Sequence, residues 1–351
     1  MMNNNISVRR PELDVAKGFA LFLVVYGHIL NSTSRLFCWI FMFHMPAFFF
    51  LSGMTFRPEK YRNLKEFLKE KWRKRLVPYF LITGIGYVIC MVWPPYRQPV
   101  LNRGWKDMLM WIFYYGQPKE LYIGQVWFLV GLFMAELIAY LWFRFLGNKP
   151  VTVKCYSLLV LAWAAVNVNS FNGFLSTVFP AVHRLPWKID TGLGAAVFLI
   201  AGYYTMKWKL LDRLKKAVWF VIPACIWFSY YYGPRQFGYV NICDCIYFPG
   251  PYYFPVAFLG IGALLFGAVV CRNWKFWQYC GRYSMPIFAA QTFVIYWVMD
   301  GIAVVTGTYY TPMREVPGSK GCLLIAVVVF LLLALGVLAW NALFLRKYTK
   351  K

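Results

Sequence analysis

The sequence predicts an all-α membrane protein, a polytopic bundle of about ten transmembrane helices with both ends of the chain in the cytoplasm. One observation is composition: 60% of the residues are hydrophobic and 14% are charged, which is far more apolar than a soluble domain. The other is that apolar segments of about twenty residues, the length that crosses a bilayer, recur along the whole chain. We expect these segments at residues 13–32, 35–56, 76–95, 124–146, 152–171, 188–206, 215–232, 254–271, 283–305 and 321–346.

The lysines and arginines are shared unevenly between the two sides of this bundle. A net charge of +24 would suit a nucleic-acid partner, but its placement indicates topology. With cytoplasmic termini, 26 of the 36 cations in loops and ends lie on the cytoplasmic side. Cytoplasmic loops of membrane proteins carry such an excess. The bias therefore sets the orientation, and we expect no nucleic-acid partner.

The first segment carries an acid, a cation and an imidazole: Asp14, Lys17 and His28. Ionisable groups at membrane depth are costly and often mark a functional site. Eleven residues make about three helical turns, so Lys17 and His28 share one helix face about 16 Å apart along the axis. Each residue alone is also compatible with a place at the membrane interface. Together they favour a pathway along this helix that is lined by the three side chains.

The second segment contains a proline, Pro46, two residues after His44. Proline removes a backbone hydrogen bond, and the freed groups at membrane depth need a neighbouring helix or a water-filled cavity. His44 is compatible with a hydrogen-bonded core histidine. Two imidazoles in adjacent helices nevertheless favour proton chemistry with His28.

The densest charge run is the segment 57–75, which has nine cations against three glutamates. Its apolar residues recur at intervals of three and four, which predicts an amphipathic helix on the cytoplasmic face. Attraction to anionic membrane lipids is sufficient to explain the charge. The alternative is an anion site, in which Arg73, Lys74 and Arg75 bind the phosphates of a nucleotide-bearing donor.

Asp190 lies at the outer side of the predicted bundle, close in sequence to His183, Arg184 and Lys188. A ligand that approaches from outside would arrive at this side. The cluster is equally compatible with an ordinary membrane-interface position for charged side chains.

Nine cysteines are scattered along the chain, and Cys243 and Cys245 are the only close pair. A disulfide between them would be strained, because only one residue separates the two cysteines. Metal binding is the alternative, but no histidine lies nearby in sequence, so we predict no metal centre. Without internal repeats or low-complexity runs, we expect residues 1–351 to form one membrane-embedded domain.

Several segments carry a family resemblance. They are Leu13–Gly18, Val24–His28, Phe43–Pro46, Phe49–Gly53, Arg75–Pro78, Val126–Leu129, Ile189–Asp190 and Gly281–Ile287. The chain resembles the acyltransferase-3 family of integral-membrane O-acyltransferases, particularly its fucose 4-O-acetylase-like branch. It departs from the family at Lys17, where arginine is commoner, and at Gln291 in a stretch where many relatives have histidine.

The resemblance implies a multi-pass protein of the bacterial inner membrane without a permanently bound cofactor. It would transfer an acyl group, usually acetyl from acetyl-CoA, to a hydroxyl of an envelope sugar, polysaccharide or lipid-linked glycan. The expected roles are a general base for His28, charge compensation for Lys17 oriented by Asp14, supporting or acceptor contacts for His44, Ser52 and Asp190, and donor binding for Arg73, Lys74 and Arg75.

The residues themselves fit this chemistry. An alcohol is a poor nucleophile at neutral pH, and a positioned imidazole that takes its proton is worth about 10²–10⁴-fold in rate. No serine sits in a nucleophile elbow, which favours direct transfer over a serine-bound intermediate. The alternative function is a proton-coupled transporter or flippase of a glycan or lipid-linked sugar, although no inverted repeat supports it.

Overall fold

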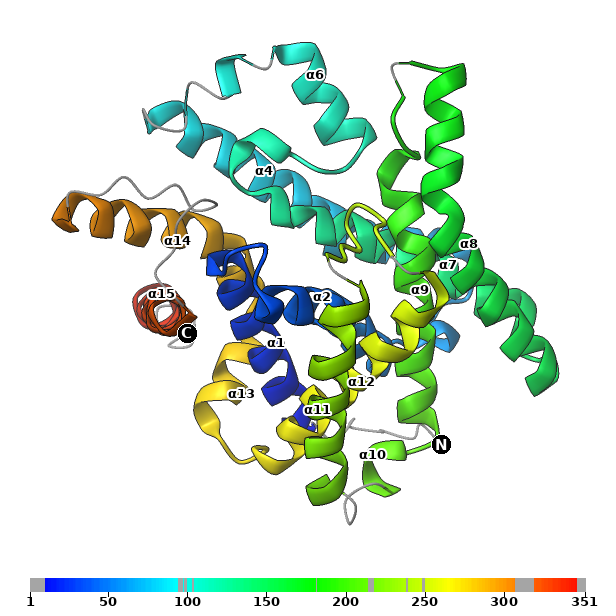
Figure 1. Cartoon of the computed structure of the whole chain (residues 1–351). Helices are drawn as coiled ribbons and strands as arrows, with labels where there is room; N and C mark the ends of the chain where they lie inside the picture. The colour runs from blue at the N-terminus through cyan, green and yellow to red at the C-terminus, as the bar shows by residue number, and fades with distance from the viewer. Residues whose placement is uncertain are drawn as a thin grey trace.

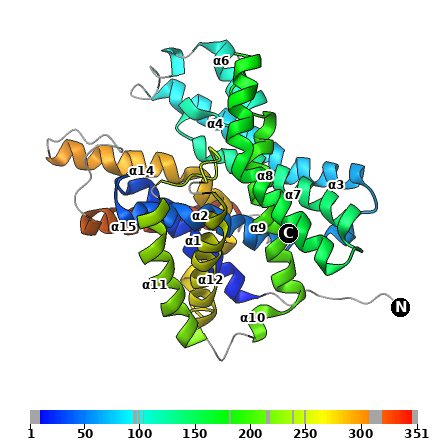
Figure 2. The same ribbon diagram turned by 45° about the vertical axis from the view of Figure 1, so that its right-hand side comes forward.

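The protein is mainly helical in the part of the chain that its computed structural model describes, which is residues 10–93, 97, 100–102, 104–180, 182–213, 218–237, 239–247, 250–306 and 319–345. The α-helices are α1 (Pro11–Ile29), α2 (Arg35–Met54), α3 (Leu64–Lys71), α4 (Val77–Val92), α6 (Trp105–Leu109), α7 (Trp127–Leu146), α8 (Val151–Val178), α9 (Ile189–Lys207), α10 (Leu210–Arg213), α11 (Val218–Phe237), α12 (Tyr253–Val270), α13 (Lys275–Arg282), α14 (Ser284–Thr306) and α15 (Ser319–Trp340). Figures 1 and 2 show their arrangement.

Every predicted apolar segment overlaps a helix in its described residues, and eight of the described helical stretches are long and apolar enough to cross a membrane. The helices α1 and α11 fall outside that set. In α1, Glu12, Asp14 and Lys17 interrupt the apolar sequence, and in α11 tyrosines and prolines lower the mean hydropathy. The count of ten spans, the placement of both termini and the single-domain organisation therefore stay predictions.

The helix α1 lies in the middle of the molecule, with α2, α12, α13, α14 and α15 around it (Figure 1). It begins with Pro11 at a position that suits proline, because the first helical N–H has no partner within the helix. Two of its aromatic residues pack against later helices: the ring centroids are 4.9 Å apart for Phe19 and Trp277 and 5.4 Å apart for Phe22 and Phe330. The residues that follow Asp14 are thereby held in the core.

The helices α2 and α9 approach each other at backbone distance. A Cβ atom on Gly53 would meet the carbonyl oxygen of Leu199, and one on Gly202 would meet the carbonyl oxygen of Phe50. Small residues of this kind let membrane helices pack closely. Ser34 caps the start of α2 by accepting a hydrogen bond of 3.1 Å from the amide of Phe37. The cap and the close packing fix the helix that carries His44.

The predicted amphipathic segment forms a helix from Leu64, and this helix continues without a break into the third apolar segment. Asn63 caps its start by accepting from the amide of Glu66, and residues Trp72–Leu76 form one π-helical turn before α4. This turn faces α7. The part of the basic run from Leu64 onward is therefore the start of a long helical stretch, Leu64–Val92, with no loop before the span, whereas residues 57–63 precede this helix.

Candidate active site

His28 and His44 line one cavity of about 640 Å³. We call it the histidine cavity, and it lies among the end of α1, the first half of α2, the start of α7 and the loop 239–247. His28 is in the last turn of α1 and its side chain is exposed to this space. The other lining residues are Val24, Gly27, Leu30, Ser32, Phe37, Phe41, Met45, Gln117, Gly124, Gln125, Trp127, Tyr239, Asn241, Ile242, Cys243, Asp244 and Phe288.

The ring of His44 is fixed by one backbone contact. Its Nδ1 lies 2.8 Å from the carbonyl oxygen of Ile40. Because a carbonyl only accepts, Nδ1 carries the proton, and Nε2 of the neutral ring is an acceptor. The ring of Phe41 bridges the two histidines, with centroids 4.7 Å from His44 and 6.2 Å from His28. His28 and His44 therefore line the cavity in an aromatic setting.

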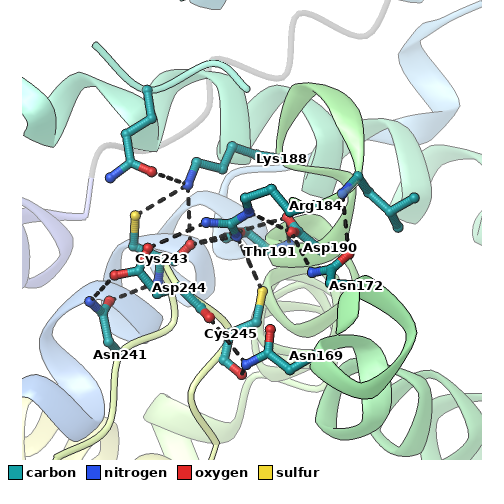
Figure 3. Close-up of polar contacts among 12 residues, drawn as sticks. Asn169, Asn172, Arg184, Lys188, Asp190, Thr191, Asn241, Cys243, Asp244 and Cys245 are labelled. Carbon is teal, nitrogen blue, oxygen red and sulfur yellow. Dashed lines mark hydrogen bonds and ion pairs between the residues drawn. The ribbon is translucent and has the colours of Figure 1, made fainter. Parts of the chain in front are cut away.

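A buried polar network borders the histidine cavity (Figure 3). At its centre, the carboxylate of Asp190 accepts from Arg184 Nε at 2.7 Å, from Asn172 at 3.2 Å and from the amide of Thr191 at 2.7 Å. Burial by itself lowers the pKa of Arg184, but the Asp190 carboxylate outweighs it and raises the pKa above its usual range. Arg184 also reaches Asp244 Oδ1 at 3.3 Å. The network thus ties α9 to the loop that lines the cavity.

Lys188 is fully buried in the same network and is held by neutral groups. Its ammonium donates to Gln117 Oε1 at 2.6 Å, to the carbonyl oxygen of Cys243 at 3.1 Å and to Cys243 Sγ at 3.3 Å. Its backbone and that of Trp187 are left-handed, with φ of 56° and 53°. Such strain costs about 1–3 kcal/mol per residue and persists only where the surroundings enforce it. The three acceptors use all three ammonium hydrogens.

The two close cysteines are thiols in this setting. Burial raises the pKa of Cys243 to about 11, although Lys188 opposes the shift. Burial and then the nearby Asp190 raise the pKa of Cys245 to about 12. Metals and electrophiles react with the thiolate form, which is scarce here at neutral pH. Within the described ranges no group of three His, Cys, Asp or Glu residues is placed to hold a metal ion.

A second cavity, of about 720 Å³, opens at the other end of α1. We call it the basic cavity because four cations line it, against two carboxylates. It is bounded by the start of α1, the end of α2 with the residues after it, and the end of α9. The lining residues are Arg10, Leu13, Asp14, Lys17, Met54, Thr55, Phe56, Arg57, Glu59, Tyr203, Met206 and Lys207.

The histidine cavity lies at one end of α1 and the basic cavity at the other. The sequence of the chain also matches a known domain. A sequence model described as an acyltransferase domain matches residues 10–346. The chain belongs to the acyltransferase-3 family. No curated protein matches the chain, and no solved structure does. The assignment to the fucose 4-O-acetylase-like branch stays a prediction.

In this acyltransferase, the expected site residues fall into separate places. His28 and His44 share the histidine cavity, and Asp190 lies behind its wall. Asp14 and Lys17 line the basic cavity instead. Lys17 and His28 thus face two cavities at opposite ends of α1, where the sequence suggested one lined pathway.

Ser52 lies in the last turn of α2, where its carbonyl oxygen accepts from Thr55 Oγ1 at 3.1 Å. It is partly buried, and neither of the two cavities counts it among the described lining residues. Its expected contact with an acceptor stays a prediction.

Two of the three predicted donor cations are engaged in ion pairs within the protein. Arg75 donates to both oxygens of Glu136, from Nε at 3.1 Å and from Nη2 at 2.9 Å. Lys74 pairs with Glu70 at 2.7 Å, and Arg73 is exposed. Neither cavity includes these three residues in its described lining. Their role in donor binding stays a prediction, with structural partners now assigned to two of them.

Sequence reasoning missed Gln125 and Asp244 in the histidine cavity and Arg57 and Lys207 in the basic cavity. The first two are single polar residues in or beside loops, where such residues are usual. Arg57 and Lys207 flank predicted spans on the cytoplasmic side, where the charge bias of membrane proteins already accounts for a cation. Only the folded arrangement brings either pair to a cavity.

Proposed function

We propose that this protein is a membrane O-acyltransferase that moves an acyl group, most simply acetyl, from acyl-CoA to a hydroxyl of an envelope sugar, polysaccharide or lipid-linked glycan in the bacterial inner membrane. The observation that carries the proposal is that His28 and His44, in a chain of the acyltransferase-3 family, line one cavity. General bases of this kind must lie within hydrogen-bond reach of the proton that they remove.

In the proposed reaction, His28 takes the proton of the acceptor hydroxyl as the oxygen attacks the thioester carbonyl. A carbon–oxygen bond forms, the carbon–sulfur bond breaks, and the leaving coenzyme A sulfur takes up the proton held by His28, so that coenzyme A departs as a thiol and His28 is neutral again. His44 supports this step through its Nε2, which can accept a hydrogen bond from the acceptor or from protonated His28. Nδ1 is committed to the Ile40 carbonyl, so the ring keeps one orientation.

The basic cavity is the better candidate for the phosphates of the donor. It brings Arg10, Lys17, Arg57 and Lys207 to one space of about 720 Å³, and phosphates favour clustered Arg and Lys side chains. Of these four, Arg10 is also paired with Asp212 at 3.0 Å. The charge bias predicts that this end of α1 faces the cytoplasm, where acyl-CoA is available. The reactive thioester would then extend along α1 toward His28. Lys17 would offset donor charge and leave proton transfer to the histidines.

A transfer assay tests the proposal. Purified protein in nanodiscs is supplied with radiolabelled acetyl-CoA and a panel of glycans, and both glycan-bound label and released coenzyme A are measured. An acyltransferase produces the two in equal amounts. A transporter or flippase produces neither, and that result with every acceptor would overturn the proposal.

A further inference from the structure

An open groove of about 370 Å³ lies on the surface of the helix bundle, and it shares no described lining residue with the two cavities. We call it the apolar groove. Phe43 of α2 and Leu264 of α12 are buried in it, whereas Ile226 of α11 and Leu331 of α15 are 41% and 44% exposed. The other described lining residues are Phe19, Phe22, Leu23, Trp39, Ala263, Phe276, Trp277, Val327 and Phe330.

The described walls of the apolar groove consist of aliphatic and aromatic side chains. The indole N–H of Trp39 donates to Ser229 Oγ at 2.9 Å, so this polar group is already used. Cavities with such walls do not hold water. Eight of the described helical stretches are long and apolar enough to cross a membrane. The acyl chains of the bilayer are therefore the apolar molecules nearest to the groove.

A cation stands next to one end of the apolar groove. Arg35 precedes Trp39 by one helical turn on α2, and Tyr230 follows Ile226 by one turn on α11. Residues four apart lie on the same face of a helix. The two outer residues meet, since Arg35 Nη2 donates to the carbonyl oxygen of Tyr230 at 3.1 Å. The guanidinium group therefore lies just beyond the apolar wall.

The guanidinium group of Arg35 is held in position without being neutralised. Residue 234 is a proline, which has no N–H for the carbonyl of Tyr230 four residues earlier, and Arg35 supplies the missing donor. Nη2 also reaches the carbonyl oxygen of Tyr231 at 3.0 Å, and the guanidinium carbon lies 4.6 Å from the centre of the Tyr230 ring. Among the described residues, Nη1 has no acceptor and Arg35 has no carboxylate partner. The charge of this partly exposed side chain is available to an anion.

The apolar groove lies against the same two helices that form the histidine cavity. Phe22 and Leu23 of α1 line the groove, whereas the next residue, Val24, lines the cavity. On α2, Phe43 lines the groove and the next residue, His44, lines the cavity. A molecule in the groove therefore contacts both helices that carry the histidines without entering the histidine cavity.

We propose that the apolar groove binds one acyl chain of an anionic membrane phospholipid, whose phosphate accepts hydrogen bonds from Arg35. Guanidinium groups are well suited to phosphate, and basic sites between membrane helices bind lipid head groups. Because Arg35 has no counter-ion, it favours a head group that brings no cation of its own. The bound lipid would pack against α1 and α2 and steady the helices of His28 and His44. This site is independent of the proposed acyl transfer.

Photo-crosslinking in nanodiscs tests the lipid site. The full-length protein is placed in phosphatidylcholine that contains some phosphatidylglycerol with a diazirine on its acyl chain, and labelled residues are identified by mass spectrometry. We expect the groove residues of α1, α11 and α15 to be labelled several-fold more than α8, whose Trp163 is 69% exposed. Excess unlabelled phosphatidylglycerol should displace the label from the groove.

Two variants separate the phosphate contact from the acyl-chain contact. Arg35→Gln should lower the groove labelling about tenfold, which is the scale of one lost charged hydrogen bond. Ala263→Phe fills the groove and should lower the labelling to the level of α8. Arg97→Gln is the matched control and should change nothing, because Arg97 is exposed and outside the described groove lining. Arg35→Gln alters a partly exposed side chain, so it tests the site even if Ala263→Phe does not fold.

Unchanged thermal unfolding shows that a variant is folded. Equal labelling of the groove and α8 in the wild type would overturn the site, because ordinary bilayer contact would explain it. Full groove labelling of a folded Arg35→Gln protein would overturn the phosphate contact and with it the choice of an anionic lipid. Displacement by an isoprenyl phosphate but not by phosphatidylglycerol would also overturn the proposal, since the occupant would then be the carrier of a lipid-linked glycan.

Discussion

Replacing Glu136 by glutamine should strongly destabilise the fold, because this carboxylate neutralises two cations inside the protein. Glu136 is 2% exposed and accepts from Lys71 at 2.8 Å and from Arg75 at 3.1 and 2.9 Å. The glutamine side chain has the same shape but no charge. Lys71, whose side chain is 8% exposed, would be left buried without a counter-ion.

Breaking a buried ion pair by removing one partner costs about 3–5 kcal/mol. The side chain of Arg75 is 27% exposed, so solvent still stabilises its charge. We therefore expect the free energy of unfolding to fall by about 3 kcal/mol, at the lower end of this range. An unfolding entropy of about 2.1 cal/mol/K per residue over 351 residues corresponds to about 1.4 °C per kcal/mol, so the melting temperature should fall by about 4 °C. Thermal unfolding followed by tryptophan fluorescence in nanodiscs measures this shift.

Lys74→Gln is the matched control, because the Lys74–Glu70 pair is exposed and such i,i+4 pairs are worth only about 0.3–0.5 kcal/mol. A melting temperature that Glu136→Gln leaves within about 2 °C of the wild type would refute the structural role of this cluster. Arg75→Gln should likewise lower stability, and the KM of this variant for acetyl-CoA tests the predicted donor binding separately. A raised KM in a protein of normal stability would return Arg75 to donor binding.

Three further predictions concern the two cavities and the helix packing. Arg57→Gln should raise the KM for acetyl-CoA several-fold with little change in kcat, as expected for lost phosphate binding, and an unchanged KM in steady-state assays would remove Arg57 from the donor site. Gly53→Ala should destabilise the fold by about 1–3 kcal/mol through overpacking against Leu199, and a normal melting temperature would contradict the close α2–α9 contact. Maleimide should modify exposed Cys155 well before Cys243, whose reaction should accelerate only as the pH rises toward its pKa of about 11. Mass spectrometry of the labelled thiols checks this order, and early labelling of Cys243 at neutral pH would contradict it.

Helix positions followed from sequence because hydropathy over about twenty residues is a local property. The predicted segment 124–146 coincides with a helical stretch of the same bounds. The predicted end at residue 171 was too early for α8, which continues to Val178. Asparagines lower the hydropathy there, but Asn172 bonds to Asp190 and Asn169 to the carbonyl of Cys245. Those partners are distant in sequence and were therefore invisible to a local reading.

The sequence could predict the candidate site only where its residues come from one helix or from two adjacent helices. His28 and His44 are placed by the helix period and by a short connection, so the sequence could pair them. The same period placed Lys17 on the face of His28 but could not show that separate cavities open at the two ends of α1. A local reading could not find the partners of Glu136 either, because Lys71 and Arg75 lie on another helical stretch.

The central claim is that His28 removes the proton of the acceptor hydroxyl, and single-turnover acetyl transfer by His28→Ala tests it most directly. The account predicts a loss of about 2–5 kcal/mol of transition-state stabilisation, with coenzyme A binding and folding preserved, because the imidazole acts on the moving proton. His28→Gln should rescue little, since glutamine cannot take up the proton. The exposed His183 provides the control, and His183→Ala should be mild. Near-normal transfer by a folded His28→Ala protein would contradict the account.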